Sequence, residues 1–348
     1  MTNKPTISEE IKQFYTGKDI LVTGGCGSIG SSIVRQLLAC NPKRVRIFDH
    51  HESGHFHLQH EHDQHPALRS LVGSIRDRKR LDMAMDGVDI VFHAAALKHV
   101  PLCEYNPFEA VHTNVLGTQN VVESAREHNV ERVISISTDK AVNPINTMGA
   151  TKLLGEKLVI SASIGDTKTK FSCVRFGNVL NSDGSVIPLF QNQIKKGGPV
   201  TVTSPDMTRF CMSINDATNL VLKAGMKTQG REIFILKMPA FRIQDLAEVL
   251  VEELAPRHGK KPADILINHV GIRPAEKLSE ALVTEEELEC LNDEGDMYVL
   301  RPRINTPHFV EPVRKKGNIP AGEWWHSGKT KLLSKEELRE HLRKENII

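Results

Sequence analysis

Short apolar runs alternate with helical patterns along the first half of the chain. The runs are apolar throughout, which predicts strands buried on both faces, and the segments between them repeat apolar residues at helical spacing. The expected strands are residues 20–23, 45–48, a run ending at 71–72, 90–93 and 133–137, and the main expected helices are 31–38, 108–128 and 148–161. Strands separated by helices predict a parallel sheet covered on both faces, a Rossmann-type, doubly wound α/β fold.

The second half has a different texture, with frequent glycines, prolines and short segments. We expect a nucleotide-binding domain over 1–178 and a smaller substrate-binding lobe over 179–348, some segments of which return to the sheet. The elements expected here are a strand at 233–236, a helix at 244–254, and a C-terminal helix that begins at the capping-box pair Ser334 and Glu337.

The bulk composition is ordinary for a globular protein. Of 348 residues, 39% are hydrophobic and 25% charged, and the formal net charge is +2. This balance does not favour a nucleic-acid or membrane-surface binder, so we expect neither partner. The six cysteines show no C-x-x-C spacing, and free thiols fit a reducing cytoplasm. The polar residues 1–18 contain no signal-peptide core, and no apolar window is long enough to span a membrane, which also favours a cytoplasmic protein.

A glycine-rich loop follows the first expected strand. Its three glycines, Gly24, Gly27 and Gly30, allow a tight turn, close approach to a pyrophosphate and close packing of the next helix. Ser28 and Ile29 open that helix, whose N-terminal N–H groups attract phosphates. The loop therefore predicts a dinucleotide site, although the same pattern on its own also occurs in plain turns.

Residues at the ends of later strands extend the same site. Asp49 ends the second strand about 20 residues after the loop, where a carboxylate binds ribose hydroxyls and repels a 2′-phosphate. This favours NAD over NADP. Asp77 follows the third strand and is positioned to bind adenine. After the fourth strand, small residues let the backbone lie against the cofactor: Ala94, Ala95 and Ala96.

The catalytic pair that is usual in short-chain dehydrogenases, Tyr-x-x-x-Lys, is absent. Lys152 stands on the helix after the fifth strand, where that lysine belongs, but Met148 occupies the position four residues earlier. Thr138 lies ten residues before Met148, where a serine or threonine is expected. The chain thus keeps two of the three expected groups.

Several segments resemble the polysaccharide-biosynthesis branch of the extended short-chain dehydrogenases/reductases, which includes the UDP-N-acetylglucosamine 4,6-dehydratases. They are 93–101 (HAAALKHVP), 113–118 (TNVLGT), 137–144 (STDKAVNP), 148–152 (MGATK), 175–180 (RFGNVL), 207–210 (MTRF) and 236–239 (LKMP). The resemblance covers roughly residues 18 to 287. Methionine in place of tyrosine resembles the C5-retaining members of this branch.

The resemblance implies a tightly bound NAD that takes hydride from C4 of the sugar and returns it to C6 after water is lost across C5 and C6. Asp139 would then be the acid for water loss and Lys140 the base at C5. Thr138 would hydrogen-bond the C4 hydroxyl, and Lys152 would orient the nicotinamide ribose. Because Met148 cannot accept a proton, water, Asp139 and Lys152 all stay open as the acceptor of the first one.

The resemblance also implies a site for a nucleoside diphosphate, whose charge suits the planar donors of arginine. Arg209 and Arg273 match arginines of the family's segments, although Ala275 stands where the family usually has glycine. Asn178 is expected to contact phosphate or sugar. The backbone of an edge strand is expected to hold the uracil: Thr201 and Thr203.

Other polar residues have two interpretations each. Lys98 and His99 follow the fourth strand and either reach substrate or face solvent. Asn114 lies in a helix pattern and either supports the cofactor site and its lysine or is an ordinary helix residue. The segment 50–65 is rich in histidine, but the spacings spread these residues around several helix faces, so we expect a solvated helix and no metal.

Three functions stay open. The adjacent acid and base, Asp139 and Lys140, favour a 4,6-dehydratase acting on UDP-N-acetylglucosamine, although some epimerases of the family resembled retain this pair. A UDP-sugar 4-epimerase shares the first hydride step, and a non-catalytic NAD-sensing module would bind the cofactor without turnover. By the same resemblance, the long helices after the fourth and fifth strands suit the interface of a homo-oligomer, a dimer or higher.

Overall fold

The computed structural model describes residues 7–164, 168–302 and 319–348. The chain divides into two compact units. Unit 1 comprises Met1–Phe176, Asn215–Leu236 and Glu285–Ile319. Unit 2 comprises Gly177–Ile214, Lys237–Thr284 and Pro320–Ile348. The chain therefore leaves unit 1 close to residue 178 and returns to it twice.

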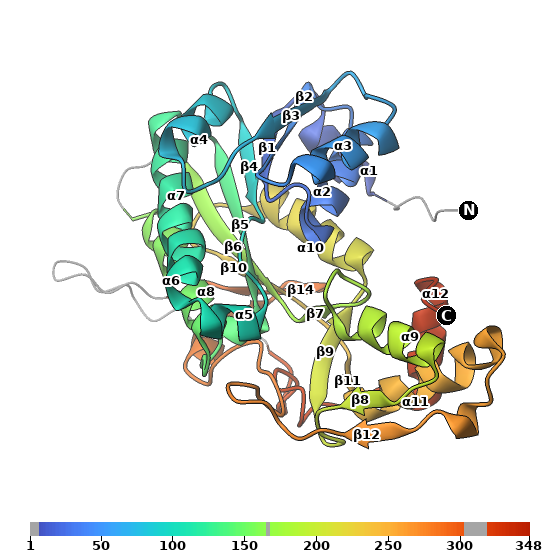
Figure 1. Ribbon diagram of the computed structural model, residues 1–348. Coiled ribbons are helices and arrows are strands. Elements are labelled where there is room, and N and C mark those ends of the chain that lie inside the picture. Colours follow the sequence, from blue (N-terminus) through green and yellow to red (C-terminus); the bar gives the residue numbers. More distant parts are fainter. Residues whose placement is uncertain (1–6, 165–167, 303–318) are drawn as a thin grey trace. The chain divides into compact units, whose positions relative to one another are not determined.

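Within the described residues, unit 1 holds a nine-stranded sheet in the order β3-β2-β1-β4-β5-β6-β10-β14-β13 (Figure 1). Pairing is parallel from β3 to β10, and the hairpin β13-β14 adds antiparallel strands at one edge. The strands are β1 (Asp19–Thr23), β2 (Arg44–Asp49), β3 (Leu68–Val72), β4 (Ile90–His93), β5 (Arg132–Thr138), β6 (Lys170–Phe176), β10 (Ile233–Leu236), β13 (Leu291–Asp293) and β14 (Met297–Leu300). This arrangement confirms the predicted Rossmann-type fold.

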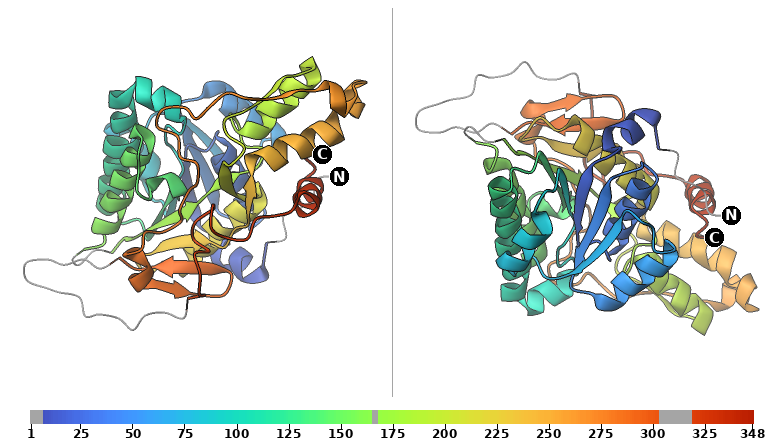
Figure 2. Two further views of the ribbon diagram at one scale, coloured as in Figure 1. Left: turned by 90° about the horizontal axis from the view of Figure 1, so that it is seen from below. Right: turned by 90° about the horizontal axis from the view of Figure 1, so that it is seen from above.

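Helices cover both faces of this sheet. Helices α4, α7 and α8 lie on one face, and α2 and α10 on the other, as the two views of Figure 2 also show. The helices of unit 1 are α1 (Glu9–Tyr15), α2 (Ser28–Leu38), α3 (Glu52–Glu61), α4 (Arg78–Met85), α5 (Val100–Tyr105), α6 (Pro107–Ala110), η1 (Val111–Gly117), α7 (Thr118–Glu127), η2 (Asp139–Ala141), α8 (Thr147–Ser161), α10 (Ile214–Lys227) and η5 (Glu287–Cys290).

Continuous apolar runs explain why the central strands are buried on both faces. All five residues of β1 are buried, and so are all four of β4. Arg175 of β6 is also fully buried, with its guanidinium held by the carboxylates of Glu156 on α8 and Glu287 on η5. A charge at this depth is tolerated because both partners are hydrogen-bonded to it.

The expected single helix over 108–128 is instead three successive helical segments. Residues Val111–Gly117, labelled η1, form a π-helix between α6 and α7. A π turn adds a residue per hydrogen-bonded ring but leaves the chain helical, so the pattern of apolar residues did not reveal it.

Unit 2 has its own apolar core, built mainly from α9, α11 and α12 and the strands beside them. Its strands form two small sheets in the described residues, β11-β9-β7 and β12-β8. The elements are β7 (Asn178–Val179), α9 (Val186–Lys196), β8 (Val200–Val202), β9 (Thr208–Met212), β11 (Ala240–Arg242), α11 (Ile243–Leu254), η3 (Pro256–His258), η4 (Pro262–Asp264), β12 (Ile267–His269) and α12 (Lys335–Lys344). The predicted capping box of Ser334 and Glu337 is present at the start of α12.

Candidate active site

The glycine loop joins β1 to the N-terminus of α2 and has no space for side chains at two of its glycines. Gly24 has a φ of +66°, and a Cβ there would lie 2.5 Å from the backbone nitrogen of Ala95. A Cβ on Gly30 would lie 2.1 Å from the carbonyl oxygen of Gly24. Gly27 is the N-cap of α2, which begins at Ser28. The loop is therefore a close-packed turn that leaves a helix N-terminus open to an anion.

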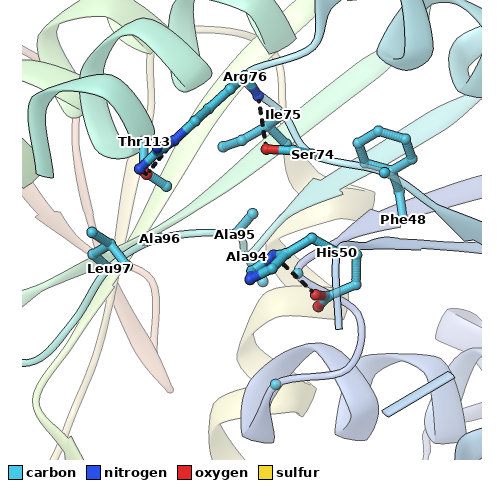
Figure 3. Close-up of a pocket in the computed structure, with 14 residues that line it drawn as sticks. Phe48, His50, Ser74, Ile75, Arg76, Ala94, Ala95, Ala96, Leu97 and Thr113 are labelled. Carbon is cyan, nitrogen blue, oxygen red and sulfur yellow. Dashed lines mark hydrogen bonds and ion pairs between the residues drawn. The ribbon is translucent and has the colours of Figure 1, made fainter. Parts of the chain in front are cut away.

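A cavity of about 390 Å³ lies beside this loop within unit 1 (Figure 3). Its volume falls in the range of ordinary small-molecule sites. It is lined by these predicted residues: Gly24, Gly27, Asp49, Ala94, Ala95 and Ala96. Residues that the sequence did not indicate also line it: Phe48, His50, Gly73, Ser74, Ile75, Arg76, Leu97 and Thr113. Other predicted cofactor residues lie outside this lining: Ser28, Ile29, Gly30, Asp77, Asn114 and Lys152.

Asp49 ties the glycine loop to the end of β2. One of its carboxylate oxygens accepts a hydrogen bond from the N–H of Cys26 at 3.0 Å, and the other accepts one from the N–H of His51 at 3.0 Å. The ring nitrogen Nδ1 of His50 lies 3.5 Å from the second oxygen. The carboxylate thus lines the cavity and also orders the loop that faces it.

Asp77 has a local structural role that the sequence did not separate from adenine binding. Its carboxylate is the N-cap of α4 and accepts a hydrogen bond from the N–H of Arg80 at 3.1 Å. The three residues just before it, Ser74 to Arg76, are the ones that line the cavity.

Asn114 holds the loop that follows β4. Its side-chain oxygen accepts from the N–H of Leu97 at 2.8 Å, and its amide nitrogen donates to the carbonyl of Leu97 and to the hydroxyl of Thr151, each at 3.0 Å. The residue is buried in the π-helical segment η1. Asn114 therefore connects the cavity wall to helix α8, which carries Met148 and Lys152.

The structure brings Thr138, Asp139 and Lys140 together at the carboxyl end of β5. The Thr138 hydroxyl and the Lys140 ammonium both donate to Oδ1 of Asp139, each at 2.9 Å. Asp139 is fully buried, and its other oxygen, Oδ2, has no hydrogen-bond partner among the described residues. A buried carboxyl group with one oxygen engaged and one available is suited to proton transfer.

Met148 and Lys152 lie one helical turn apart on α8. Met148 is buried and packs against Cys103 and Ala110. The Lys152 ammonium donates to the carbonyl of Ile136 at 2.6 Å. Its removal from water lowers the pKa of Lys152, an effect that Cys173 and Glu156 partly oppose.

His93, at the end of β4, is the other strongly shifted group near this helix. Burial, with a smaller effect of Lys152, lowers the pKa of His93 to about 3. Its Nδ1 lies 2.7 Å from the Thr23 hydroxyl and its Nε2 lies 3.0 Å from the Thr118 hydroxyl. The Thr118 hydroxyl donates to the carbonyl of Asn114, so it can accept from His93 Nε2–H. In the neutral ring that the lowered pKa of His93 favours, Nδ1 is then the acceptor for the Thr23 hydroxyl.

The predicted substrate residues differ in their exposure to solvent and in their hydrogen bonds. Within unit 1, Lys98 and His99 are exposed after β4. Within unit 2, the Asn178 side-chain oxygen has no hydrogen-bond partner among the described residues, and Thr201 is held by two hydrogen bonds to Gln193. Thr203 follows the end of β8, which pairs with β12.

Of the two predicted arginines, Arg209 is buried and Arg273 is exposed. The Arg209 guanidinium donates to the carbonyls of Thr208, Lys277 and Leu278. It therefore holds the backbone at the end of the segment that carries Arg273. In that segment Ala275 adopts a φ of +64°, a conformation that glycine adopts with less strain.

The histidine-rich segment forms α3, and most of its histidines are exposed. His55 is buried, and its Nε2 lies 3.0 Å from the carbonyl oxygen of Asp49. In the part of the chain that the structure describes, no group of three histidine, cysteine or acidic side chains is arranged to hold a metal ion. Nor is any helix of that part both long and apolar enough to cross a membrane.

A parallel sheet with a glycine loop, a small-residue wall and a Thr-Asp-Lys cluster around the buried Asp139 defines a Rossmann-type fold with a candidate site at the carboxyl ends of its strands. The family of polysaccharide biosynthesis proteins matches residues 20–302. The chain belongs to this family.

Known proteins match most of the chain. An uncharacterized membrane protein of Methanocaldococcus jannaschii is 56% identical over 337 residues, which cover 96% of this chain and 98% of that protein. The UDP-glucose 4-epimerase of Rickettsia massiliae is 40% identical, covering 94% and 96%. The capsular polysaccharide biosynthesis protein CapD of Staphylococcus aureus is 47% identical over 80% of this chain, which spans only 47% of CapD. Among solved structures, Pen from Bacillus thuringiensis is 42% identical with a TM-score of 0.87 and covers 95% of this chain and 98% of its own.

Proposed function

We propose that this protein is an NAD-dependent enzyme that modifies a nucleotide-activated sugar, and that its reaction is the 4,6-dehydration of UDP-N-acetylglucosamine. Membership of the polysaccharide biosynthesis family supports the general class. The observation that carries the specific reaction is the buried Asp139 carboxyl group beside Lys140, with Oδ2 lacking a partner among the described residues.

The cavity in unit 1 fits a dinucleotide. The glycine loop and the helix N-terminus beside it suit a pyrophosphate, and Asp49 at the end of β2 suits a ribose and disfavours a 2′-phosphate. When bound, NAD would supply an acceptor for hydride from C4 of the sugar and a donor to C6.

The protein's own groups would move the protons. Transfer of a proton from the Lys140 ammonium to Asp139 leaves a neutral amine beside a carboxylic acid. Lys140 then takes the proton from C5, which the ketone at C4 has made acidic, and Asp139 gives its proton to the C6 hydroxyl, which leaves as water. Lys140 returns the proton to C5 when C6 is reduced. The hydrogen bond from Thr138 and the ammonium group of Lys140 hold Asp139 in place. Elimination needs both an acid and a base. Because C5 and C6 are bonded neighbours, the two side chains must also lie side by side.

The first proton, from the C4 hydroxyl, needs a different acceptor, since Met148 has no basic atom. Burial lowers the pKa of Lys152, so this amine loses its proton more readily than a surface lysine does. We propose Lys152 as that acceptor, with the Thr138 hydroxyl orienting the C4 oxygen.

We also propose that residues of unit 2 bind the nucleotide. Arg273 is exposed and Asn178 has an unpartnered side-chain oxygen among the described residues, so both side chains suit contacts with phosphate or sugar. In this proposal Arg209 acts indirectly, because its guanidinium already donates to the carbonyls of Thr208, Lys277 and Leu278.

A second candidate function is 4-epimerisation of a UDP-sugar. It is favoured by one observation, the similarity over almost the whole chain to a UDP-glucose 4-epimerase. An epimerase removes and returns the hydride at C4 and needs no acid for a leaving group at C6. Asp139 therefore favours elimination, although some epimerases retain the Asp-Lys pair.

The experiment is to incubate the purified protein with UDP-N-acetylglucosamine and record the mass of the product. A dehydratase yields a sugar nucleotide lighter by one water, and an epimerase yields one of unchanged mass. No conversion of UDP- or GDP-sugars by a protein that does bind NAD would favour the NAD-sensing module.

A further inference from the structure

Arg76 connects two walls of the cofactor cavity. It belongs to the loop between β3 and α4, and its side chain reaches the helical segment that holds Glu109 and Thr113 (Figure 3). Its guanidinium donates to Glu109 Oε2 at 2.5 Å and to the Glu109 carbonyl at 3.1 Å. It also donates to the Thr113 hydroxyl from Nε at 3.0 Å and from Nη2 at 2.6 Å.

Those bonds are not required to hold the cavity wall in place. The carbonyl of Ile75 already accepts a hydrogen bond from Asn120 of α7 at 2.9 Å. A Cβ on Gly117 would lie 2.6 Å from Cδ1 of Ile75, so the helix already packs closely on this wall. The loop is therefore fixed by contacts that do not involve the Arg76 side chain, although that side chain lines the cavity.

The position of Arg76 relates it to one end of the cofactor. In a Rossmann sheet the acidic residue at the end of β2 marks the adenosine ribose. The loop that follows the neighbouring strand β3 lines the same cavity, so it lies on the adenosine side of the site. Arg76 follows β3, the strand next to β2, and lines the cavity together with Phe48 and Ile75. A guanidinium fixed at its edge by hydrogen bonds keeps its planar face available for an aromatic base.

We propose that Arg76, held by Glu109 and Thr113, covers the adenine ring and retains the dinucleotide between turnovers. This inference rests on the proposed function, in which the cofactor is reoxidised within each cycle and has no need to leave. Slow release of the cofactor is useful for such a reaction. If the reduced cofactor left before the cycle ended, the keto intermediate could not be reduced at C6.

The test compares dissociation rates of NAD from the full-length protein. The Arg76→Ala variant should release NAD about tenfold faster, the size expected from losing one cation–aromatic contact. Glu109→Ala, which frees the guanidinium without altering a cavity-lining residue, should also release NAD faster. Saturating NAD should restore turnover in Arg76→Ala, since the catalytic groups are untouched.

Arg78→Ala is the matched control. Arg78 lies two residues further on and pairs with Asp82, Glu123 and Glu127, but it does not line the cavity. It should release NAD at the wild-type rate. Equal acceleration in Arg76→Ala and Arg78→Ala would point to general loosening and overturn the proposal, as would a rate for Arg76→Ala within twofold of wild type.

ADP-ribose, which has the adenine but not the nicotinamide, tests the assigned end. Its affinity should fall in Arg76→Ala by the same factor as that of NAD; an unchanged affinity would contradict the adenine assignment. If the wild-type protein binds neither NAD nor ADP-ribose, the proposed function fails together with the role of Arg76. If the wild type binds both and the Arg76→Ala variant behaves like it, only the role of Arg76 fails.

Discussion

The chemistry proposed for this protein depends on the hydrogen bonds of one carboxyl group, that of Asp139. Asp139 is fully buried, yet both hydrogen bonds that it receives go to the same oxygen, from Thr138 and from Lys140. Thr138 and Lys140 were expected beside it from the sequence, but which oxygen stays available depends on side-chain orientation and could not be read from residue order.

An Asp139→Asn substitution tests this arrangement with little change of shape. The amide oxygen can accept the same two hydrogen bonds, so the variant should fold and bind NAD like the wild type. Product formation should fall by about 10²-fold or more, because loss of a general acid costs that much. The measurement is the rate of conversion of UDP-N-acetylglucosamine.

The control is Asp86→Asn, the same chemical change at an exposed position after α4. It should leave the rate unchanged. Undiminished dehydration by the Asp139 variant would remove this residue from the mechanism.

His93 makes a prediction about stability and pH. Its pKa is lowered to about 3 by burial, from an ordinary value near 6.5. The unfolded chain therefore binds a proton below about pH 6.5 that the folded chain excludes until about pH 3. The free energy of unfolding should fall as the pH decreases through this window, with a contribution from this group of about 1.4 kcal/mol per pH unit.

Denaturant unfolding of His93→Gln over this window measures that contribution. The substitution should flatten the pH dependence by about one proton, whereas His57→Gln, at an exposed position of α3, should have no such effect. An identical pH slope in wild type and His93→Gln would show that His93 is not held neutral.

Among the elements, those specified by neighbouring residues were predictable from the sequence, and features that depend on contacts between distant residues were not. The buried strands, the glycine loop and the capping box at Ser334 follow from patterns within a few residues. The π-helical segment η1 did not, because its apolar pattern resembles that of an α-helix. Asp77 is ambiguous in sequence, since an aspartate before a helix suits both an N-cap and a ligand. Arg76 carried no motif, and only its contacts with Glu109 and Thr113 reveal its place at the cavity.

The glycine loop supplies a prediction with an internal control. Gly24 and Gly17 have similar positive φ values, +66° and +73°, but only at Gly24 would a Cβ meet backbone atoms. Alanine at either position should cost about 1–2 kcal/mol of conformational strain. Gly24→Ala should in addition abolish binding of NAD, measured by titration calorimetry, whereas Gly17→Ala should bind NAD normally. Wild-type affinity in Gly24→Ala would show that the close packing of Gly24 against Ala95 is not needed to bind NAD.

At the scale of the whole molecule, we propose that the chain forms a homo-oligomer through the helices around η1 and α8. Large apolar side chains are exposed on these packed helices: Leu102, Tyr105, Phe108, Leu116 and Leu154. Apolar side chains gathered in this way are typical of a surface that another protein covers. Light scattering should give at least a dimer, and a Leu116→Glu, Leu154→Glu double variant should be smaller while still binding NAD. A monomeric wild type at micromolar concentration would contradict this proposal.

Elimination of water across C5 and C6 can be followed in one reaction, the turnover of UDP-N-acetylglucosamine in deuterated water. By NMR and mass spectrometry we expect a 4-keto-6-deoxy product that has lost one water and carries deuterium at C5, because the base at C5 exchanges its proton with solvent. A product of unchanged mass, inverted at C4 and without deuterium at C5, would contradict the dehydration and identify the protein as an epimerase.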